Sequence, residues 1–234
     1  MASPLLILSA LSLLLCDLVR SIQPYRLRVE YEQNPQGIDI TNPRFFWAID
    51  NEGVRGAVQT AYQIVVYSKG NTVVADTGKI KSSNSAHITI DSLKLTSHSR
   101  YRWTVQIYDA SDTASNVEMA FFSAGLLNQP SDWQNAEWIG IAKGTSNQKN
   151  QFRTEFTVGP TSAYIEHATC YIAMPGYYEA FLNEQQLDDH ALGYFTTFEM
   201  RVYYDAVDCT DSLKANDQNV FGIVMGNGWY SQPS

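Results

Sequence analysis

Residues 99–109 read SRYRWTVQIYD, and the alternation in this stretch decides the fold class. Successive side chains of an extended chain point to opposite faces, so the large apolar side chains of this stretch share one face. They are Tyr101, Trp103, Val105 and Ile107. The segment TAYQIVVYS at residues 60–68 has the same period. After residue 24 no stretch sustains the spacing of an amphipathic helix, so the sequence predicts an all-β protein.

The region around these two segments predicts a β-sandwich. Seven short strands fit between about residues 25 and 124, with turn compositions between them. Trp47 stands where a sandwich of the immunoglobulin or fibronectin type III kind buries a tryptophan, and Tyr101 follows Leu95 at the spacing of a tyrosine corner. Alternation assigns Trp47 and Trp103 to the core rather than to an exposed aromatic platform.

The length and charge of the chain limit its organisation and its partners. A chain of 234 residues suffices for two β-domains of about 100 residues each. We expect a sandwich at residues 24–125, a linker at 126–137 and a second β-domain at 138–234, with a short helical turn near Asp208–Leu213. The net charge of -8 would repel phosphate backbones, so nucleic acid is not an expected partner.

The first 21 residues have the composition of a signal peptide. Their apolar core, PLLILSALSLLL, is shorter than the run of about 20 residues that spans a membrane, and it ends at Asp17 and Arg20. A membrane anchor is the competing interpretation. We therefore expect a secreted, extracellular protein with no membrane span after cleavage, and Cys16 would be removed with the leader.

Two cysteines remain, Cys170 and Cys209, and they form a candidate disulfide in an oxidising compartment. The alternative is two buried free thiols that pack as small apolar side chains. Neither cysteine has a second ligand at C-x-x-C or C-x-x-H spacing, so we expect no metal site. The sequence also predicts no cofactor, because the glycines of GNGWY at residues 226–230 lack the helix and lysine of a phosphate-binding loop.

Nine segments, in this order, resemble the N-terminal, non-catalytic region of the α-L-rhamnosidases, which are multidomain glycoside hydrolases. They are QTAYQIVVYS (59–68), DTGKIKSSNS (76–85), SRYRWTVQIYD (99–109), AFFSAGLL (120–127), DWQNAEWIG (132–140), FRTEF (152–156), PGYYEAFLN (175–183), RVYYDAVDCT (201–210) and GNGWY (226–230). The resemblance implies a fibronectin type III-like sandwich followed by part of a jelly-roll domain that resembles a carbohydrate-binding module. It also implies a helical catalytic barrel further along the polypeptide, and no segment here matches that barrel.

The chain departs from the family pattern at two places. Asn183-Glu184 stands where the family has Asn-Gly, and LGYFT at residues 192–196 replaces a segment with a proline and a tryptophan. A jelly roll needs about eight strands, whereas residues 138–234 supply five or six. We therefore expect a truncated second domain that is sensitive to proteases, beside a first sandwich that folds alone.

Four aromatic residues are candidate carbohydrate contacts: Tyr177, Tyr178, Trp229 and Tyr230. The structural alternative, which we favour, is a turn with positive φ at Gly226 and Gly228, after which the last two aromatic residues anchor the chain. Tyr177 and Tyr178 are neighbours on a strand and point to opposite faces, so at most one of them can face a ligand.

No catalytic residue can be assigned from the sequence. Asp188, Asp189 and His190 could be imagined as a metal or acid-base group, but they lie between expected strands and indicate a solvated turn. The three remaining histidines are isolated in sequence from one another and from any nucleophile motif; they are His87, His98 and His167.

Two functions fit these observations. The first is an accessory N-terminal fragment of a secreted α-L-rhamnosidase-like enzyme, inactive alone, whose partners are a C-terminal catalytic domain and a rhamnose-containing glycoside. The alternative is a stand-alone secreted carbohydrate-binding or adhesive protein of two modules. A fibronectin-like receptor fragment is a weaker third hypothesis, because it leaves residues 138–234 unexplained.

Overall fold

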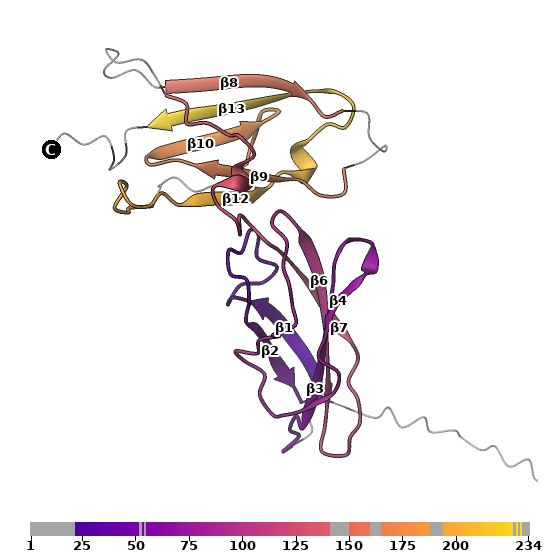
Figure 1. Cartoon of the computed structure of the whole chain (residues 1–234). Helices are drawn as coiled ribbons and strands as arrows, with labels where there is room; N and C mark the ends of the chain where they lie inside the picture. Colours follow the sequence, from indigo (N-terminus) through magenta and orange to yellow (C-terminus); the bar gives the residue numbers. More distant parts are fainter. Residues whose placement is uncertain are drawn as a thin grey trace, which may run out of the picture.

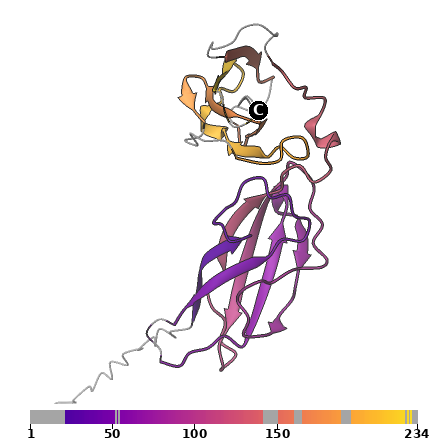
Figure 2. The same cartoon turned by 90° about the vertical axis from the view of Figure 1, so that its left-hand side faces the viewer.

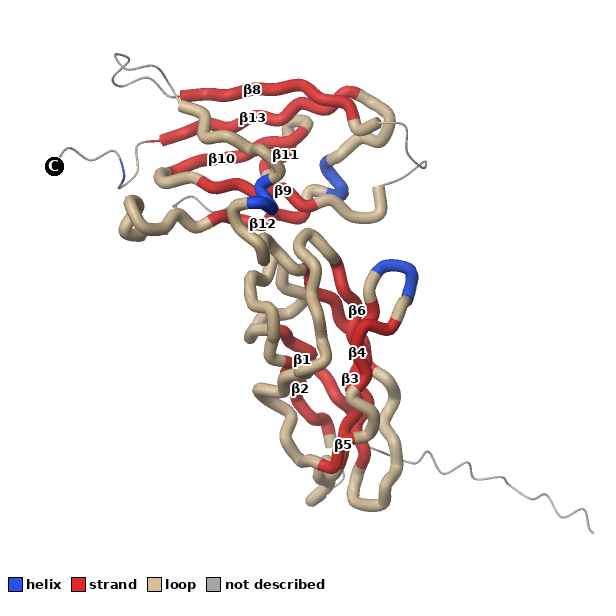
Figure 3. The backbone as a smooth tube through the Cα atoms, viewed as in Figure 1, coloured by secondary structure: helices blue, strands red, loops and turns tan. Residues whose placement is uncertain are grey.

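The computed structural model describes most of the chain after the predicted leader, and the leader itself lies outside the described residues. The described residues are 22–51, 53, 55–140, 150–159, 165–187, 194–226, 228 and 230. Within them the regular elements are strands and three single turns of 3-10 helix, so the all-β prediction is confirmed. Figure 1 and Figure 3 show two β units, one above the other.

The first unit contains seven strands in two layers (Figure 2). They are β1 (Gln23–Val29), β2 (Phe45–Asp50), β3 (Ala61–Tyr67), β4 (Val73–Asp76), β5 (Ile80–Lys81), β6 (Arg100–Tyr108) and β7 (Glu118–Ser123), with the 3-10 turn η1 (Lys69–Asn71) before β4. One layer is the antiparallel pair β1-β2, and the other has the order β4-β3-β6-β7 with β5 on β3. The two layers form an open β-sandwich.

The apolar faces expected from alternation make up the core of the first unit. Trp103 of β6 is fully buried and meets Phe45 of β2 at a ring-centroid distance of 4.9 Å. Trp47 is 4% exposed, and its indole Nε1 donates to Oε1 of Gln59 at 2.9 Å. This hydrogen bond satisfies the buried indole N–H of Trp47. Both tryptophans are therefore core residues, as predicted.

The tyrosine corner is also confirmed. The hydroxyl oxygen of Tyr101 accepts a hydrogen bond of 2.7 Å from the backbone N–H of Thr96, five residues upstream. The Tyr101 ring stacks on Phe122 of β7 at 5.1 Å. The corner thus joins the loop before β6 to the core, and this loop carries His98 to the end of the unit that faces the second unit.

The second unit has two sheets that face each other. Its strands are β8 (Asn150–Thr157), β9 (Thr169–Ala173), β10 (Tyr177–Leu182), β11 (Gln185–Gln186), β12 (Tyr204–Asp208) and β13 (Gln218–Gly226), and its 3-10 turns are η2 (Ser131–Trp133), in the connecting segment, and η3 (Thr210–Ser212). One sheet has the order β11-β10-β13-β8, and the other is the pair β12-β9. The Tyr178 hydroxyl of β10 donates to Asp205 of β12 across the gap. The predicted turn near Asp208–Leu213 is η3.

The hairpin after β10 keeps its tight turn although it lacks the family glycine. Asn183 and Glu184 both have positive φ, 51° and 72°. The turn continues directly into β11, which pairs with Phe181 and Leu182. Asn183 supports the turn, because its Oδ1 accepts from the N–H of Val220 at 2.9 Å. A left-handed conformation costs a residue such as Glu184 roughly 1–2 kcal/mol.

The predicted positive-φ turn at Gly226 and Gly228 is wrong. Gly226 is the last residue of β13, and neither glycine adopts a left-handed φ. Gly228 is instead needed for a close approach of two backbones, since a Cβ on it would lie 2.7 Å from the Cα of Gly176. Gly228 therefore permits close packing beside the start of β10 rather than a bend of the chain.

Candidate functional site

The outer face of the small sheet β9-β12 packs on the end of the first unit, and hydrogen bonds join the two units at this contact (Figure 1). Tyr204 accepts a hydrogen bond of 3.1 Å from the backbone N–H of Leu126. The hydroxyl of Tyr171 donates to the carbonyl of Ala124 at 3.4 Å. The centroids of the two rings lie 5.9 Å apart, so the pair covers the end of the first unit near Ala124 and Leu126.

Two glycines of the first unit allow this close contact. A Cβ on Gly37 would lie 2.3 Å from Cβ of Ala206 on β12. A Cβ on Gly125 would lie 2.4 Å from the Tyr204 hydroxyl and 2.5 Å from the Gly37 carbonyl oxygen. Real Cβ atoms do not approach other atoms so closely, so each position requires glycine as long as the two units are packed as they are.

The segment that connects the units folds back on the same junction. The ring of Trp133, in η2, meets Tyr204 at 5.8 Å. His98, from the loop before β6, lies edge-on to Tyr171 at 5.2 Å, and its Nε2 lies 3.0 Å from the carbonyl oxygen of Asp132. Three segments far apart in sequence therefore meet around Tyr171 and Tyr204.

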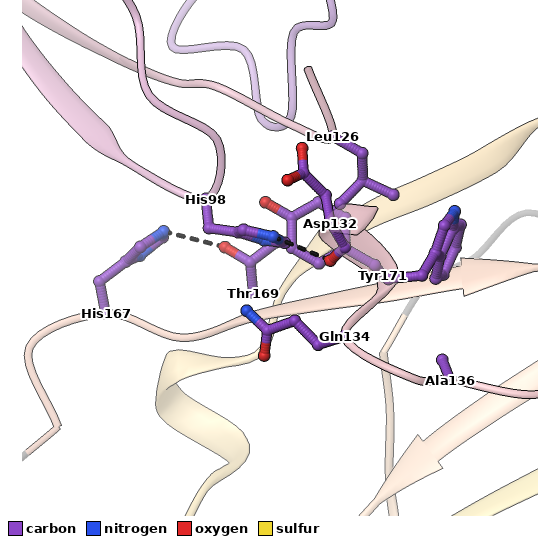
Figure 4. A pocket seen from close by; sticks show the side chains of 9 residues that line it. His98, Leu126, Asp132, Gln134, Ala136, His167, Thr169 and Tyr171 are labelled. Atoms are coloured by element: carbon purple, nitrogen blue, oxygen red, sulfur yellow. Dashed lines mark hydrogen bonds between the residues drawn. The ribbon is translucent and has the colours of Figure 1, made fainter. Parts of the chain in front are cut away.

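A pocket of about 450 Å³ opens where these segments meet (Figure 4). It is lined by His98, Leu126, Asp132, Trp133, Gln134, Ala136, His167, Thr169 and Tyr171. Leu126 is buried beneath it, whereas Gln134 and Ala136 are exposed at its rim. Its lining mixes aromatic rings with hydrogen-bonding groups, a combination typical of small-molecule sites at domain interfaces.

The ionisable groups of this pocket have shifted pKa values. Hydrogen bonds from the Ser97 side chain and the Asn128 backbone lower the pKa of Asp132, and the Asn128 bond measures 2.7 Å. Burial lowers the pKa of His167, against the nearby carboxylate of Asp208. Burial raises the pKa of the Tyr171 hydroxyl to about 12. At neutral pH the pocket therefore holds a carboxylate, a neutral imidazole and a protonated phenol.

A second, more apolar groove of about 840 Å³ runs along β9, whose only strand partner within the described residues is β12. Its apolar lining includes Ile172 and Cys170 from β9, Phe221 and Ile223 from β13, and Trp138 from the connecting segment. Phe221 and Ile223 remain partly exposed in this groove, and Trp138 is 71% exposed. The inner faces of the two sheets are thus incompletely covered by the described chain.

The structure does not gather the four candidate carbohydrate contacts into one site. Tyr178 points between the sheets, where Asp205 accepts a hydrogen bond from its hydroxyl. Tyr177 lies on the opposite face of β10, as alternation requires. Tyr230 is 62% exposed and meets Phe198 at 5.5 Å. Trp229 lies outside the described residues. Carbohydrate binding by these side chains stays a prediction.

Cys170 lies on β9, whereas Cys209 directly follows the last residue of β12, so the two are diagonal to each other. Cys170 pairs with Val207, and the N–H of Cys209 donates to the carbonyl of Ala168 at 3.0 Å. Both are free thiols in the structure. Burial and the neighbouring Cys209 raise the pKa of Cys170 to about 12, and burial also raises the pKa of Cys209. Their pairing in an oxidising compartment stays a prediction.

The remaining polar candidates are placed as follows. Asp188, Asp189 and His190 lie outside the described residues. Within the described part of the chain no group of three potential ligands could hold a metal ion. His87 packs against Phe46 of β2 at 5.0 Å in the first unit. None of the helical segments described is long and apolar enough to cross a membrane.

His98 and His167, which are far apart in sequence, line the same pocket. The sequence carried no signal for this pocket, because its residues come from the loop before β6, the connecting segment and β9 with the residues just before it. Only the packing of the two units brings these segments together. The sequence places Tyr171 and Tyr204 in strand-like segments, but it does not predict their hydrogen-bond partners in the first unit.

Comparisons with known proteins agree with this architecture. A family model described as Rha78A-like, N-terminal immunoglobulin domain matches residues 24–128. A second, described as Alpha-L-rhamnosidase N-terminal domain, matches residues 163–234. The two matches correspond to the first sandwich and to most of the second unit.

Curated relatives match across both units. An α-L-rhamnosidase of Formosa agariphila is 31% identical over 229 residues, covering 86% of this chain and 24% of the relative. An α-L-rhamnosidase of Alteromonas sp. is 28% identical over 233 residues, covering 92% of this chain and 25% of the relative. The chain therefore spans about a quarter of the length of these relatives.

Solved structures match in the same way. The α-L-rhamnosidase from Dictyoglumus thermophilum has a TM-score of 0.74 at 28% identity, over 89% of this chain and 25% of that chain. The α-L-rhamnosidase from Aspergillus terreus has a TM-score of 0.76 at 29% identity, over 90% and 24%. The two-unit arrangement thus has counterparts in larger proteins.

Proposed function

This chain carries the immunoglobulin-like and N-terminal domains of the α-L-rhamnosidase family, and from that premise we propose that it is the accessory N-terminal region of a secreted glycoside hydrolase. In the complete enzyme it would support a catalytic domain that follows it in the polypeptide. That enzyme would hydrolyse terminal α-L-rhamnose from glycosides, and this region alone would not be catalytic. Both relatives described above are α-L-rhamnosidases, which supports the substrate class.

The incompletely covered groove beside β9 carries this proposal. Apolar surface such as that of Trp138, Phe221 and Ile223 is stabilised by contact with further protein. Among the described residues β9 has a partner on one side, so its other edge offers N–H and C=O groups to a neighbouring segment. A longer polypeptide, as in relatives about four times the length of this chain, would supply that cover.

Secretion is part of the proposal and is supported by the sequence of residues 1–21. An apolar core of signal-peptide length followed by Val19 and Ser21 fits a leader that is cleaved. A glycosidase whose substrate lies outside the cell must be secreted to reach it. The mature protein would then begin near Ile22, the first described residue of the sandwich.

The test is the mass of the native polypeptide. An antibody raised against residues 22–234 is used on a blot of secreted and cellular fractions of the source material. We expect a band several times larger than the 26.3 kDa of this chain, in the secreted fraction. A single band at or slightly below 26.3 kDa would contradict the accessory-region proposal.

A stand-alone carbohydrate-binding protein is the alternative, and the exposed aromatic side chains of the second unit favour it. Tyr230 is 62% exposed and Phe195 is 74% exposed. Aromatic faces of this kind can stack on sugars, as they stack on other rings. The small band on the blot, together with sugar binding that is lost in Tyr230→Ala, would select this alternative.

A further inference from the structure

We propose that the pocket at the junction of the two units binds a neutral, hydroxyl-rich ligand of monosaccharide size. The pocket is distinct from the candidate residues Tyr177, Tyr178 and Tyr230, none of which lines it. The proposal goes beyond the accessory role and does not depend on it, since a pocket of this kind could act in a long or a short polypeptide.

The size and position of the pocket fit a small ligand. Its volume of about 450 Å³ lies within the range of about 300–1,000 Å³ that is usual for small-molecule sites, which occur preferentially at domain interfaces. Side chains from the first unit, the connecting segment and the second unit all contribute to its wall. A bound ligand would therefore contact both units at once.

The polar groups of the pocket suit hydroxyl groups, which need donors and acceptors together. Asp132 is an acceptor with about four lone-pair sites, and its known partners are Ser97 and Asn128. Gln134 offers both a donor and an acceptor in one side chain. Among the described residues its side-chain amide has no hydrogen-bond partner, whereas its backbone N–H donates to Ser131. Figure 4 shows Gln134 and Thr169 in the wall of the pocket, and the Thr169 hydroxyl lies 3.1 Å from Nε2 of His167.

The electrostatics favour a neutral ligand over an anion or a metal ion. The described lining contains neither lysine nor arginine, and its one carboxylate, on Asp132, would repel an anion. His167 carries no charge at neutral pH, because burial disfavours its protonated form. A metal ion needs at least three ligands close together, and no such group of His, Cys, Asp or Glu side chains exists among the described residues.

The aromatic side chains supply the remaining contacts. Trp133 and Tyr171 both line the pocket, and each is half-buried, so each still offers part of its ring. The C–H groups of a sugar ring pack on such faces while its hydroxyl groups hydrogen-bond to the polar side chains. Both rings are held by other aromatic groups: Trp133 by Tyr204 and Tyr171 by His98. The pocket is thus formed before the ligand arrives.

The experiment is a titration of the purified, isotope-labelled chain with L-rhamnose and D-glucose, followed by NMR. We expect saturable shifts at sugar concentrations of about 10 mM, centred on Gln134, Thr169 and the indole of Trp133. Gln134→Ala should weaken binding about tenfold, the effect of losing one well-placed hydrogen bond. Gln186→Ala is the matched control, because Gln186 is an exposed glutamine of β11 outside the pocket, and it should bind like the parent.

Three results would overturn the proposal: shifts that fail to saturate with either sugar, saturable binding that Gln134→Ala leaves unchanged, or binding of inorganic sulfate in preference to both sugars. The chemical-shift spectrum of each variant without ligand shows whether it is folded. Thr169→Val, which keeps the shape and removes the hydroxyl, provides an independent second variant. The blot of the native protein tests the accessory role separately, so either idea can fail alone.

Discussion

The two units of this molecule are built from the same kind of alternating strand, but only the first encloses its core. Among the described residues, all but four of the buried apolar side chains lie between Ile22 and Leu126. The four exceptions, in the second unit, are Ile172, Ala180, Leu182 and Cys209. The second unit instead contains a groove of about 840 Å³ between incompletely covered faces. Alternation therefore specifies strands, whereas enclosure depends on how many strands face one another.

The difference also shows where the second unit obtains its stability. Its small sheet uses one face for its own interior, through Asp205 and Ile172, and the other face for the first unit, through Tyr171 and Tyr204. The contact with the first unit thus substitutes in part for the missing cover. The predicted sensitivity of residues 138–234 to proteases should then depend on this junction.

The largest expected effect comes from a matched pair of phenylalanine truncations. Phe122→Ala, at a side chain that is 1% exposed and stacked on Tyr101, should cost about 3–5 kcal/mol of unfolding free energy. Phe221→Ala, at a partly exposed side chain in the groove, should cost about 1–2 kcal/mol, because part of its surface is already in water. Urea unfolding of both variants measures the two values. Equal losses would show that the second unit is as well enclosed as the first.

A glycine pair tests the junction itself. Gly37 has φ of 66° and meets Ala206, whereas Gly70 has φ of 75° with no atom within 4 Å of its added Cβ. Gly70→Ala should therefore cost only the backbone term, about 1–2 kcal/mol. Gly37→Ala adds overpacking of about 1–3 kcal/mol and should speed trypsin cleavage of the second unit. Equal melting temperatures and cleavage rates for the two variants would contradict the packing described here.

A tyrosine pair measures one bond of that junction. Tyr204→Phe leaves the N–H of the buried residue Leu126 without its acceptor and should cost about 1–3 kcal/mol. Tyr203→Phe, at an adjacent residue that is half exposed, should change stability by less than about 0.5 kcal/mol. Thermal unfolding of both variants makes the comparison. If the adjacent change costs as much, the bond to Leu126 contributes nothing specific.

The smallest effect is a pH dependence. Burial lowers the pKa of His167 in the folded protein, so the unfolded chain takes up a proton more readily. The stability linked to neutral His167 is thus fully present above its unfolded pKa of about 6.5 and is lost as the pH falls through the folded pKa. His167→Gln should flatten the fall in stability between about pH 7 and pH 5. A slope equal to that of the parent would exclude His167 as its source.

Much of the fold could be predicted from local pattern, and the candidate site could not. The period of two places Trp47 and Trp103 in the core, and the spacing from Leu95 to Tyr101 predicts the tyrosine corner. The positive-φ turn predicted at Gly226 and Gly228 is wrong, because a glycine can also permit the close approach of two backbones, as Gly228 does. The pocket could not be foreseen, since His98, Asp132 and Thr169 meet only through the packing of one unit on another.

The double use of the sheet β9-β12 has a consequence for anyone who wishes to transplant these domains. A fusion that moves the second unit without the first would expose Tyr171, Tyr204 and Ala206 to water, and one that moves the first alone would leave Gly37 and Gly125 facing solvent. The two units should therefore be moved together in a fusion protein, with the N-terminal boundary placed before residue 22 and no boundary between the units.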